Sequence, residues 1–322
     1  MKKFTNRAAI LLLFLWLIPQ SASAARLLLP VGEIIGLKLA DDTVTVSAFD
    51  DSIGAAAKNA GLAVGDRILK VDGKKITCVK DIRNALDRCD GSVTVSVMRK
   101  GKQRSLDLTP QITDDGPRLG VYLKEGTTGV GTVTFYDPDS GKFGALGHGV
   151  NDASGSLLQM REGQVYDASV VTVKKGKAGT PGQLMGALDG SRMLGRLNKN
   201  TAQGVFGILD ADWKGQVLPV GSSKELHTGS AAIRCAVNGE SVQEYSVEIL
   251  KIYPRSGADG RNMLLRITDP ALLNLTGGIV QGMSGSPIIQ DGKLVGAVTH
   301  VLVNDPTTGY GIFIENMLDA AA

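Results

Sequence analysis

The stretch Gln281-Gly282-Met283-Ser284-Gly285-Ser286-Pro287, which runs into Ile288-Ile289-Gln290, has the pattern of a serine nucleophile on a tight turn before an apolar strand. A serine hydroxyl is a weak nucleophile, so it needs a base within hydrogen-bonding reach and amide donors for the oxyanion that forms after attack. Gly282 can take backbone angles closed to other residues, which would let the amides of Gly282 and Ser284 point to one spot. The alternative is a Gly-Ser hairpin between two strands, because short motifs also match by chance.

The search for a base is short, because the chain has three histidines. His148 stands between two glycines at the end of an expected strand, where an imidazole can project into a cleft with little crowding. His300 falls in an alternating strand and is the alternative base, or else a wall of the pocket. His227 is expected in a solvent-exposed loop.

An acid that holds the imidazole in the correct tautomer has two candidates. Asp269 and Asp305 each follow an expected strand and precede a proline. Both Asp-Pro pairs are also ordinary turn signals, and spacing alone does not choose between them.

Residues 1–24 have the pattern of a signal peptide. A basic start is followed by an apolar run over residues 8–19 and by Ala22-Ser23-Ala24, which fits a small-residue cleavage site. The run is shorter than the roughly 20 residues that a spanning helix prefers, so export with cleavage is expected, and retention as a membrane anchor is the alternative.

Charge and cysteine usage exclude several classes of function. The formal net charge of +3 falls to zero once Lys2, Lys3 and Arg7 are removed, so a nucleic-acid partner has no electrostatic support. The three cysteines include a pair, Cys78 and Cys89, that flanks an expected helix of about 16 Å, too long for a disulfide. Three free thiols are therefore predicted, and no His or Cys pair has the spacing of a metal site.

The rest of the chain has two parts with different sequence patterns, joined by a short linker. Residues 26–110 read as a small αβ module, residues 111–117 as a polar linker around Asp114-Asp115-Gly116, and residues 118–322 as short strands separated by turn signals. In the last part, two strands are expected to pair across the turn at residues 137–141. So many short strands predict a pair of β-barrels or a sandwich.

The first module resembles a bacterial PDZ domain through the combination of Ala60-Gly61-Leu62, Gly65-Asp66 and Val71-Asp72-Gly73. In that family, the loop before the first long strand captures a peptide terminus or strand through backbone amides. The resemblance maps that loop to Ile35-Gly36-Leu37. Alternatively, Ile35 and Leu37 are core residues of an inert module.

Behind this module, Gly147-His148-Gly149, Asp269 and the Gly282–Pro287 turn together resemble the SpoIVB peptidases, the stage IV sporulation serine proteases. The resemblance implies a mainly β, chymotrypsin-like double β-barrel preceded by the PDZ domain. It also implies a triad of His148, Asp269 and Ser284, and an oxyanion hole made by the amides of Gly282 and Ser284. No metal or organic cofactor is expected. Asp269 stands only fifteen residues before Ser284, so the acid would come from the serine's own half of the enzyme.

The role implied by the resemblance is signalling by limited proteolysis. Members of the family are exported to the space between forespore and mother cell and cleave themselves. They also cleave a membrane-held regulator of an intramembrane protease that processes a late sigma factor. The PDZ domain would hold the enzyme's own N-terminal segment or the tail of the target.

Two other functions remain as alternatives. One is an exported PDZ adaptor with a non-catalytic barrel. The other is a general extracytoplasmic quality-control protease, which is disfavoured because its usual Gly-Asn-Ser-Gly-Gly-Pro turn is absent.

Overall fold

The first barrel is a ring of antiparallel strands in a computed structural model, which describes residues 26–152, 155–239, 241–254 and 260–322. The leader predicted at residues 1–24 lies outside the described residues. Six described strands follow one another around the ring, and the pairing of the last with the first closes it. They are β9 (Val121–Tyr136), β10 (Lys142–Ala145), β13 (Gly204–Leu209), β12 (Gln183–Thr201), β11 (Glu162–Lys174) and β2 (Ile34–Phe49). The short strand β1 (Leu27–Pro30) pairs with the end of β9, and β14 (Leu218–Pro219) pairs with β1.

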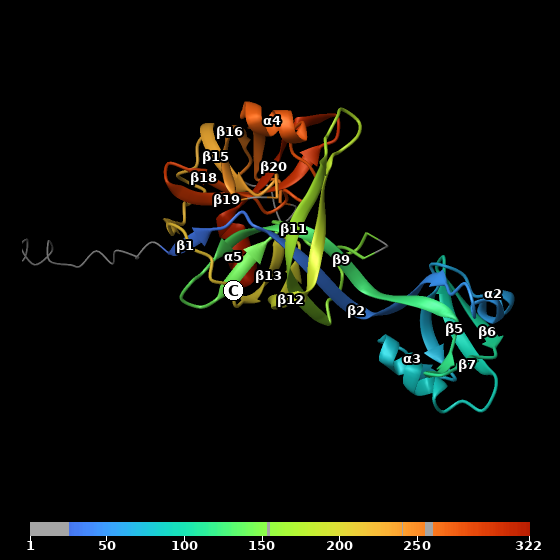
Figure 1. Ribbon diagram of the computed structural model, residues 1–322. Coiled ribbons are helices and arrows are strands. Elements are labelled where there is room, and N and C mark those ends of the chain that lie inside the picture. Colours follow the sequence, from blue (N-terminus) through green and yellow to red (C-terminus); the bar gives the residue numbers. More distant parts are fainter. Residues whose placement is uncertain (1–25, 153–154, 240, 255–259) are drawn as a thin grey trace, which may run out of the picture.

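The second barrel closes in the same way. Its described strands in order are β15 (Gly229–Cys235), β16 (Gln243–Ile252), β17 (Met263–Ile267), β20 (Asp305–Phe313), β19 (Lys293–Leu302) and β18 (Pro287–Gln290). Helix α4 (Pro270–Thr276) lies against it, and α5 (Ile314–Ala321) packs between the two barrels (Figure 1). The double β-barrel expected from the sequence is confirmed.

The hairpin predicted at residues 137–141 is also present. Phe143 pairs with Tyr136 on the neighbouring strand, and Gly141 N donates to Asp137 O. Both aromatic side chains are buried in the core of the first barrel.

The αβ module has its own apolar core. Its strands are β3 (Arg67–Val71), β4 (Lys74–Lys75), β5 (Val93–Arg99) and β6 (Lys102–Leu108), and its helices are α2 (Ala55–Asn59) and α3 (Val79–Leu86). A small hairpin, β7 (Gln111–Thr113) and β8 (Gly116–Arg118), follows. Cys78 precedes α3 and Cys89 follows it, and both are free, as is Cys235, so the prediction of three free thiols is confirmed.

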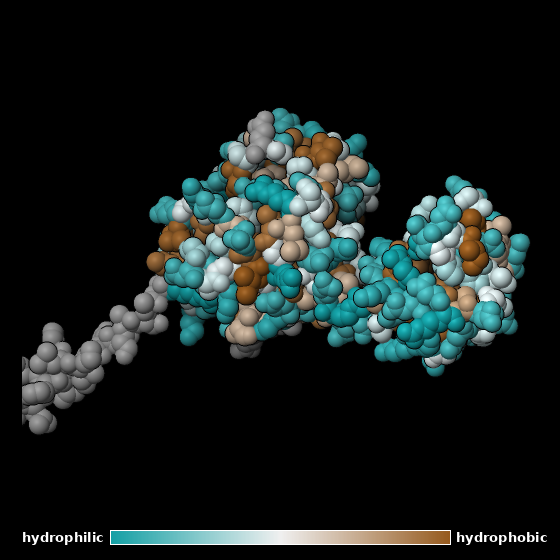
Figure 2. Space-filling model, turned by 60° about the horizontal axis from the view of Figure 1, so that its bottom comes forward, coloured by the Kyte–Doolittle hydropathy of each residue, from teal (hydrophilic) through white to brown (hydrophobic). Residues whose placement is uncertain are grey.

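The module is an insertion into the first barrel rather than a domain that simply precedes it. Strands β2 and β9 form a long antiparallel ribbon, paired from Ile34 with Thr132 to Phe49 with Val121. One end of the ribbon lies in the barrel and the other in the module core, so the module stands apart as a lobe (Figure 1, Figure 2).

The expected boundaries at residues 26 and 118 therefore differ from those observed. Residues 27–39 pair with strands of the first barrel, whereas Leu119 is buried in the core of the module. Alternating apolar residues identify a strand, but the alternation does not say which of two cores the apolar face meets.

Candidate active site

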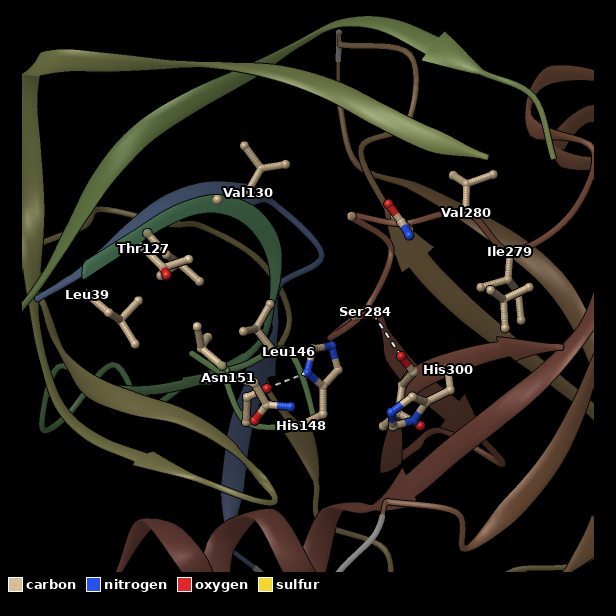
Figure 3. A pocket seen from close by; sticks show the side chains of 18 residues that line it. Leu39, Thr127, Val130, Leu146, His148, Asn151, Ile279, Val280, Ser284 and His300 are labelled. Carbon is tan, nitrogen blue, oxygen red and sulfur yellow. Dashed lines mark hydrogen bonds between the residues drawn. The ribbon is translucent and has the colours of Figure 1, made fainter. Parts of the chain in front are cut away.

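A cavity of about 550 Å³ lies where the two barrels meet, and both barrels line it. His148 comes from the loop after β10, Ser284 from the turn before β18 and His300 from β19. Figure 3 shows these three side chains close together at one end of the cavity. Apolar side chains, among them Leu39, Val130 and Ile279, make much of the remaining wall.

His148 is delivered by a backbone that bends sharply after β10. Leu146 and Gly147 both have a φ of +70°, and a Cβ on Gly147 would approach Thr299 Cγ2 to 2.8 Å, so a glycine is required there. His148 Nδ1 lies 2.9 Å from Gly149 O. In the tautomer with the proton on Nδ1, this bond leaves Nε2 as an acceptor, which is the form that a general base requires.

Burial lowers the pKa of His148, because removing the imidazolium from water disfavours the charged form. The hydrogen bond to Gly149 O acts in the opposite direction but is the smaller influence. The imidazole is therefore neutral over a wider range of pH than an exposed histidine.

The turn that carries Ser284 depends on two glycines with positive φ, Gly282 at +101° and Gly285 at +98°. A Cβ on Gly285 would stand 2.0 Å from Thr132 O and 2.6 Å from Leu146 N, which are backbone atoms of the first barrel. Because backbone atoms cannot turn aside, the sequence has to place a glycine next to the serine.

Hydrogen bonds fix the carbonyls that belong to the two predicted oxyanion amides. Gln281 O accepts from Leu184 N on β12 at 2.8 Å. Met283 O accepts from Ser286 N at 3.0 Å and from Ser286 Oγ at 2.7 Å. In a trans peptide the N–H points away from the C=O, so these bonds also fix the directions of the following N–H groups.

Those N–H groups are the amides of Gly282 and Ser284. Among the hydrogen bonds within the described part of the chain, neither amide donates to a protein acceptor, although their neighbours Met283 N and Gly285 N both do. Two unused donors beside a serine are what an oxyanion hole needs.

The Ser284 hydroxyl donates to Thr299 O at 2.8 Å. Proton transfer to His148 thus requires the hydroxyl to leave this carbonyl. In enzymes without substrate, catalytic hydrogen bonds are often long or directed elsewhere and tighten when substrate binds.

His300 lies beside His148, with ring centroids 5.4 Å apart and planes inclined by 40°. It lines the same cavity, in agreement with the expected wall of the pocket. His227 lies on the surface, where its Nε2 is 2.8 Å from Asp291 Oδ2, as expected of a loop residue.

Asp269, the expected acid, does not line this cavity. It is the N-cap residue of α4, and its Oδ1 accepts from Ala271 N at 2.9 Å and Leu272 N at 3.0 Å. Asp305 likewise closes a turn, where it accepts from Thr307 Oγ1 at 2.6 Å. The expectation that Asp269 orients His148 is therefore corrected, and the group that the described structure places on His148 Nδ1 is the carbonyl of Gly149.

The predicted peptide-binding loop of the PDZ module, Ile35-Gly36-Leu37, is also misplaced. These residues lie in β2 within the first barrel, where β9 pairs on one side and β11 on the other. Ile35 and Leu37 are almost fully buried. Because both edges of the strand are already paired, no peptide can add there, and the alternative that they are core residues is the correct one.

A second cavity, of about 440 Å³, forms a groove in the αβ module instead. It lies between α3 and the start of β9, and Leu119 and Gly120 form the loop at its end. Among the described strands, residues 121–123 of β9 pair only with β2, so their other edge faces the groove. The sequence signal for this loop is Leu119-Gly120-Val121, which the expected boundary at residue 118 places in the second domain.

Two other observations concern metals and membranes. The part of the chain that the structure describes holds no group of three or more His, Cys, Asp or Glu side chains that could bind a metal ion. Among its helices, none is long and apolar enough to cross a membrane.

Comparison with protein families decides the identity of the fold. Residues 115–318 match the model of the SpoIVB peptidase S55 family, and residues 35–109 match that of the PDZ domain. The chain belongs to the SpoIVB peptidase S55 family. It is accordingly a serine peptidase of family S55 that carries a PDZ domain, as the resemblance in its motifs implied.

Curated relatives are similar over smaller parts. A protein of Rhizobium meliloti named as a zinc metalloprotease is 27% identical over 234 residues, which cover 72% of this chain and 52% of the relative. One of Staphylococcus aureus with the same kind of name is 36% identical over 81 residues, or 25% of this chain and 19% of the relative. The chain thus spans about half the length, or less, of these relatives.

Two proteases are among the solved structures that match parts of this chain. The Rv3671c protease of Mycobacterium tuberculosis in its active form is 15% identical, with a TM-score of 0.34 over 61% of this chain and 75% of that one. The HtrA-type protease AlgW is 14% identical, with a TM-score of 0.36 over 60% and 54%.

Proposed function

We propose that the chain is a serine endopeptidase in which Ser284 is the nucleophile, His148 the general base, and the amides of Gly282 and Ser284 the oxyanion hole. One observation carries the proposal: a serine, a histidine and two unused amide donors line one cavity. The apolar walls of that cavity suit the side chains of a peptide substrate.

The reaction is acyl transfer. His148 Nε2 takes the proton of Ser284 Oγ as the oxygen attacks the scissile carbonyl carbon, and the two amides stabilise the negative charge that forms on the carbonyl oxygen. The imidazolium then gives its proton to the leaving amine, and water hydrolyses the acyl-enzyme by the same steps in reverse order. Gly149 O holds the Nδ1 proton throughout, which fixes the tautomer.

The biological role we propose is limited proteolysis in sporulation signalling. The enzyme would act after export, in the space between forespore and mother cell, secreted or anchored by its N-terminal segment. Its substrates would be its own N-terminal segment and a membrane-held regulator of an intramembrane protease that processes a late sigma factor. The supports are membership of the SpoIVB family and a PDZ module attached to a peptidase.

The PDZ groove would bind a peptide as an added strand. The open edge at residues 121–123 supplies backbone donors and acceptors, and the apolar residues of α3 offer a surface for alternate side chains. The peptide would come from the N-terminal segment or from the tail of the target.

A fluorophosphonate probe tests the catalytic assignment. Wild-type protein should be labelled, Ser284→Ala should not be labelled, and His148→Ala should react at least about 10³-fold more slowly. His227→Ala is the matched control, because its histidine lies on the surface, and it should react as wild type. Absence of Ser284-dependent labelling would favour the non-catalytic adaptor.

Sequencing the N-termini of protein from sporulating cells tests the role. Wild type and Ser284→Ala should both show any removal of the leader by a separate peptidase. Only wild type should show additional cleavage, and identical N-termini would exclude self-cleavage.

A further inference from the structure

We propose that Thr132, on β9, is a positioning residue that holds the nucleophile turn so that its oxyanion amides face the cavity. This inference rests on the proposed function of Ser284, Gly282 and the cavity around them. Thr132 comes from the other barrel and stands about 150 positions before the turn, so its role is not visible in the motif itself.

Thr132 makes two hydrogen bonds to the turn, one on each side of Met283. Its Oγ1 donates to Gly282 O at 2.7 Å, and its backbone N donates to Ser284 O at 3.1 Å. Its own carbonyl accepts from Leu146 N at 3.2 Å, just before the loop that carries His148. One residue is therefore bonded to the chain on both sides of the cavity.

The hydroxyl is needed because Gly282 has no side chain to restrict its backbone. A glycine at a φ of +101° can rotate its peptide planes with little steric cost, and rotation there would change the angle between the Gly282 N–H, which the bond from Leu184 N to Gln281 O fixes, and the Ser284 N–H. The bond from Thr132 Oγ1 holds the carbonyl of Gly282, and thereby the plane between Gly282 and Met283, in one direction.

The placement of Thr132 is also unusual for a core position. The neighbouring Val133 lies in the core of the first barrel, whereas Thr132 and Thr134 face the second, and all three side chains are almost fully buried. A buried hydroxyl costs free energy unless it is bonded. Thr134 Oγ1 donates to Gly285 O at 2.7 Å, so both hydroxyls on this face of β9 bind carbonyls of the nucleophile turn.

The expected effect is on the chemical step. Removing an oxyanion-hole donor altogether lowers kcat by about 10²–10³-fold. Thr132→Val keeps both donors and the shape of the side chain but releases the carbonyl of Gly282, so we expect kcat to fall by about 10-fold. Since the hole acts in the transition state, KM should stay within about twofold of wild type.

Hydrolysis of p-nitrophenyl acetate by the full chain, corrected for the Ser284→Ala background, measures this effect. Thr132→Val should lower kcat at constant KM, and Thr132→Ser, which keeps the hydroxyl, should recover kcat to within about threefold. Thr276→Val is the control: its hydroxyl is equally buried, but it binds Leu272 O and Gly278 O at the end of α4 and makes no hydrogen bond to the nucleophile turn. It should lose stability without loss of kcat.

The outcomes separate two failures. If wild type shows no hydrolysis above the Ser284→Ala background, the proposed function fails and this inference fails with it. If wild type is active, the inference alone is overturned when Thr132→Val has the kcat of wild type, when Thr132→Ser is as slow as Thr132→Val, or when Thr276→Val loses kcat equally.

Discussion

Replacement of Gly285 by alanine should disable the enzyme, and replacement of Gly292 provides the matched control. Both glycines have a positive φ, +98° and +72°, so an alanine at either site carries a backbone strain of about 1–2 kcal/mol. At Gly292 a Cβ meets nothing within 4 Å. At Gly285 it would stand 2.0 Å from Thr132 O and 2.6 Å from Leu146 N.

The added cost at Gly285 comes from overpacking between the barrels. Overpacking of a well-packed site costs about 1–3 kcal/mol, and here the opposing atoms are backbone that no rotamer change can move. Gly285→Ala should therefore lose about 3 kcal/mol or more of unfolding free energy, against about 1–2 kcal/mol for Gly292→Ala. Relief of the clash would displace Ser284 by about 1 Å, which is worth about 10²-fold in rate.

Urea denaturation followed by circular dichroism measures the unfolding free energies, and the rate of fluorophosphonate labelling measures the reactivity of Ser284. Gly292→Ala should label as wild type, and Gly285→Ala should label at least about 10²-fold more slowly. The reasoning is refuted if Gly285→Ala matches Gly292→Ala in both measurements, because the turn would then not be pressed against the first barrel.

Three further predictions concern His148, Asp269 and Arg83. Because the neutral imidazole is the reactive form and burial lowers its pKa, the rate of labelling should rise with pH, with a midpoint below 6.5, and a midpoint above 6.5 would contradict this environment. Asp269→Ala removes a helix N-cap and should cost about 0.5–2 kcal/mol of unfolding free energy. Its kcat for p-nitrophenyl acetate should change less than twofold. If kcat is lost in correctly folded protein, Asp269 is the acid of the triad after all. Arg83→Glu places a negative charge at the groove of the PDZ module and should weaken binding of a labelled peptide with an apolar C-terminus by about 1 kcal/mol, measured by fluorescence anisotropy. Lys80→Glu, on the same helix outside the groove, is its control, and equal effects of both would place the peptide elsewhere.

Local features were predictable from the sequence. The glycines around Ser284 and His148 indicate their own backbone angles, and the hairpin at residues 137–141 and the helix between Cys78 and Cys89 follow from short-range turn and helix signals. These features depend on a few neighbouring residues, and the structure has them where they were expected.

The predictions for Asp269 and for Ile35-Gly36-Leu37 were wrong because each sequence pattern is compatible with two structures. Asp269 before Pro270 fits an acid at a strand end, but it fits equally well an N-cap followed by proline at the first helical position, and the second use is the one observed. Ile35 and Leu37 alternate as any half-buried strand does, so their sequence could not distinguish the core of a barrel from the wall of a groove.

The insertion of the PDZ module gives β9 a double role that neither motif shows alone. Its first residues form the open edge of the groove, and Thr132, further along the same strand, holds the nucleophile turn. Between these points β9 is paired with β2 along most of the ribbon, with irregular register between Leu39 and Val44. A peptide that adds a strand at the groove would therefore pair with the same strand that, further along, carries Thr132.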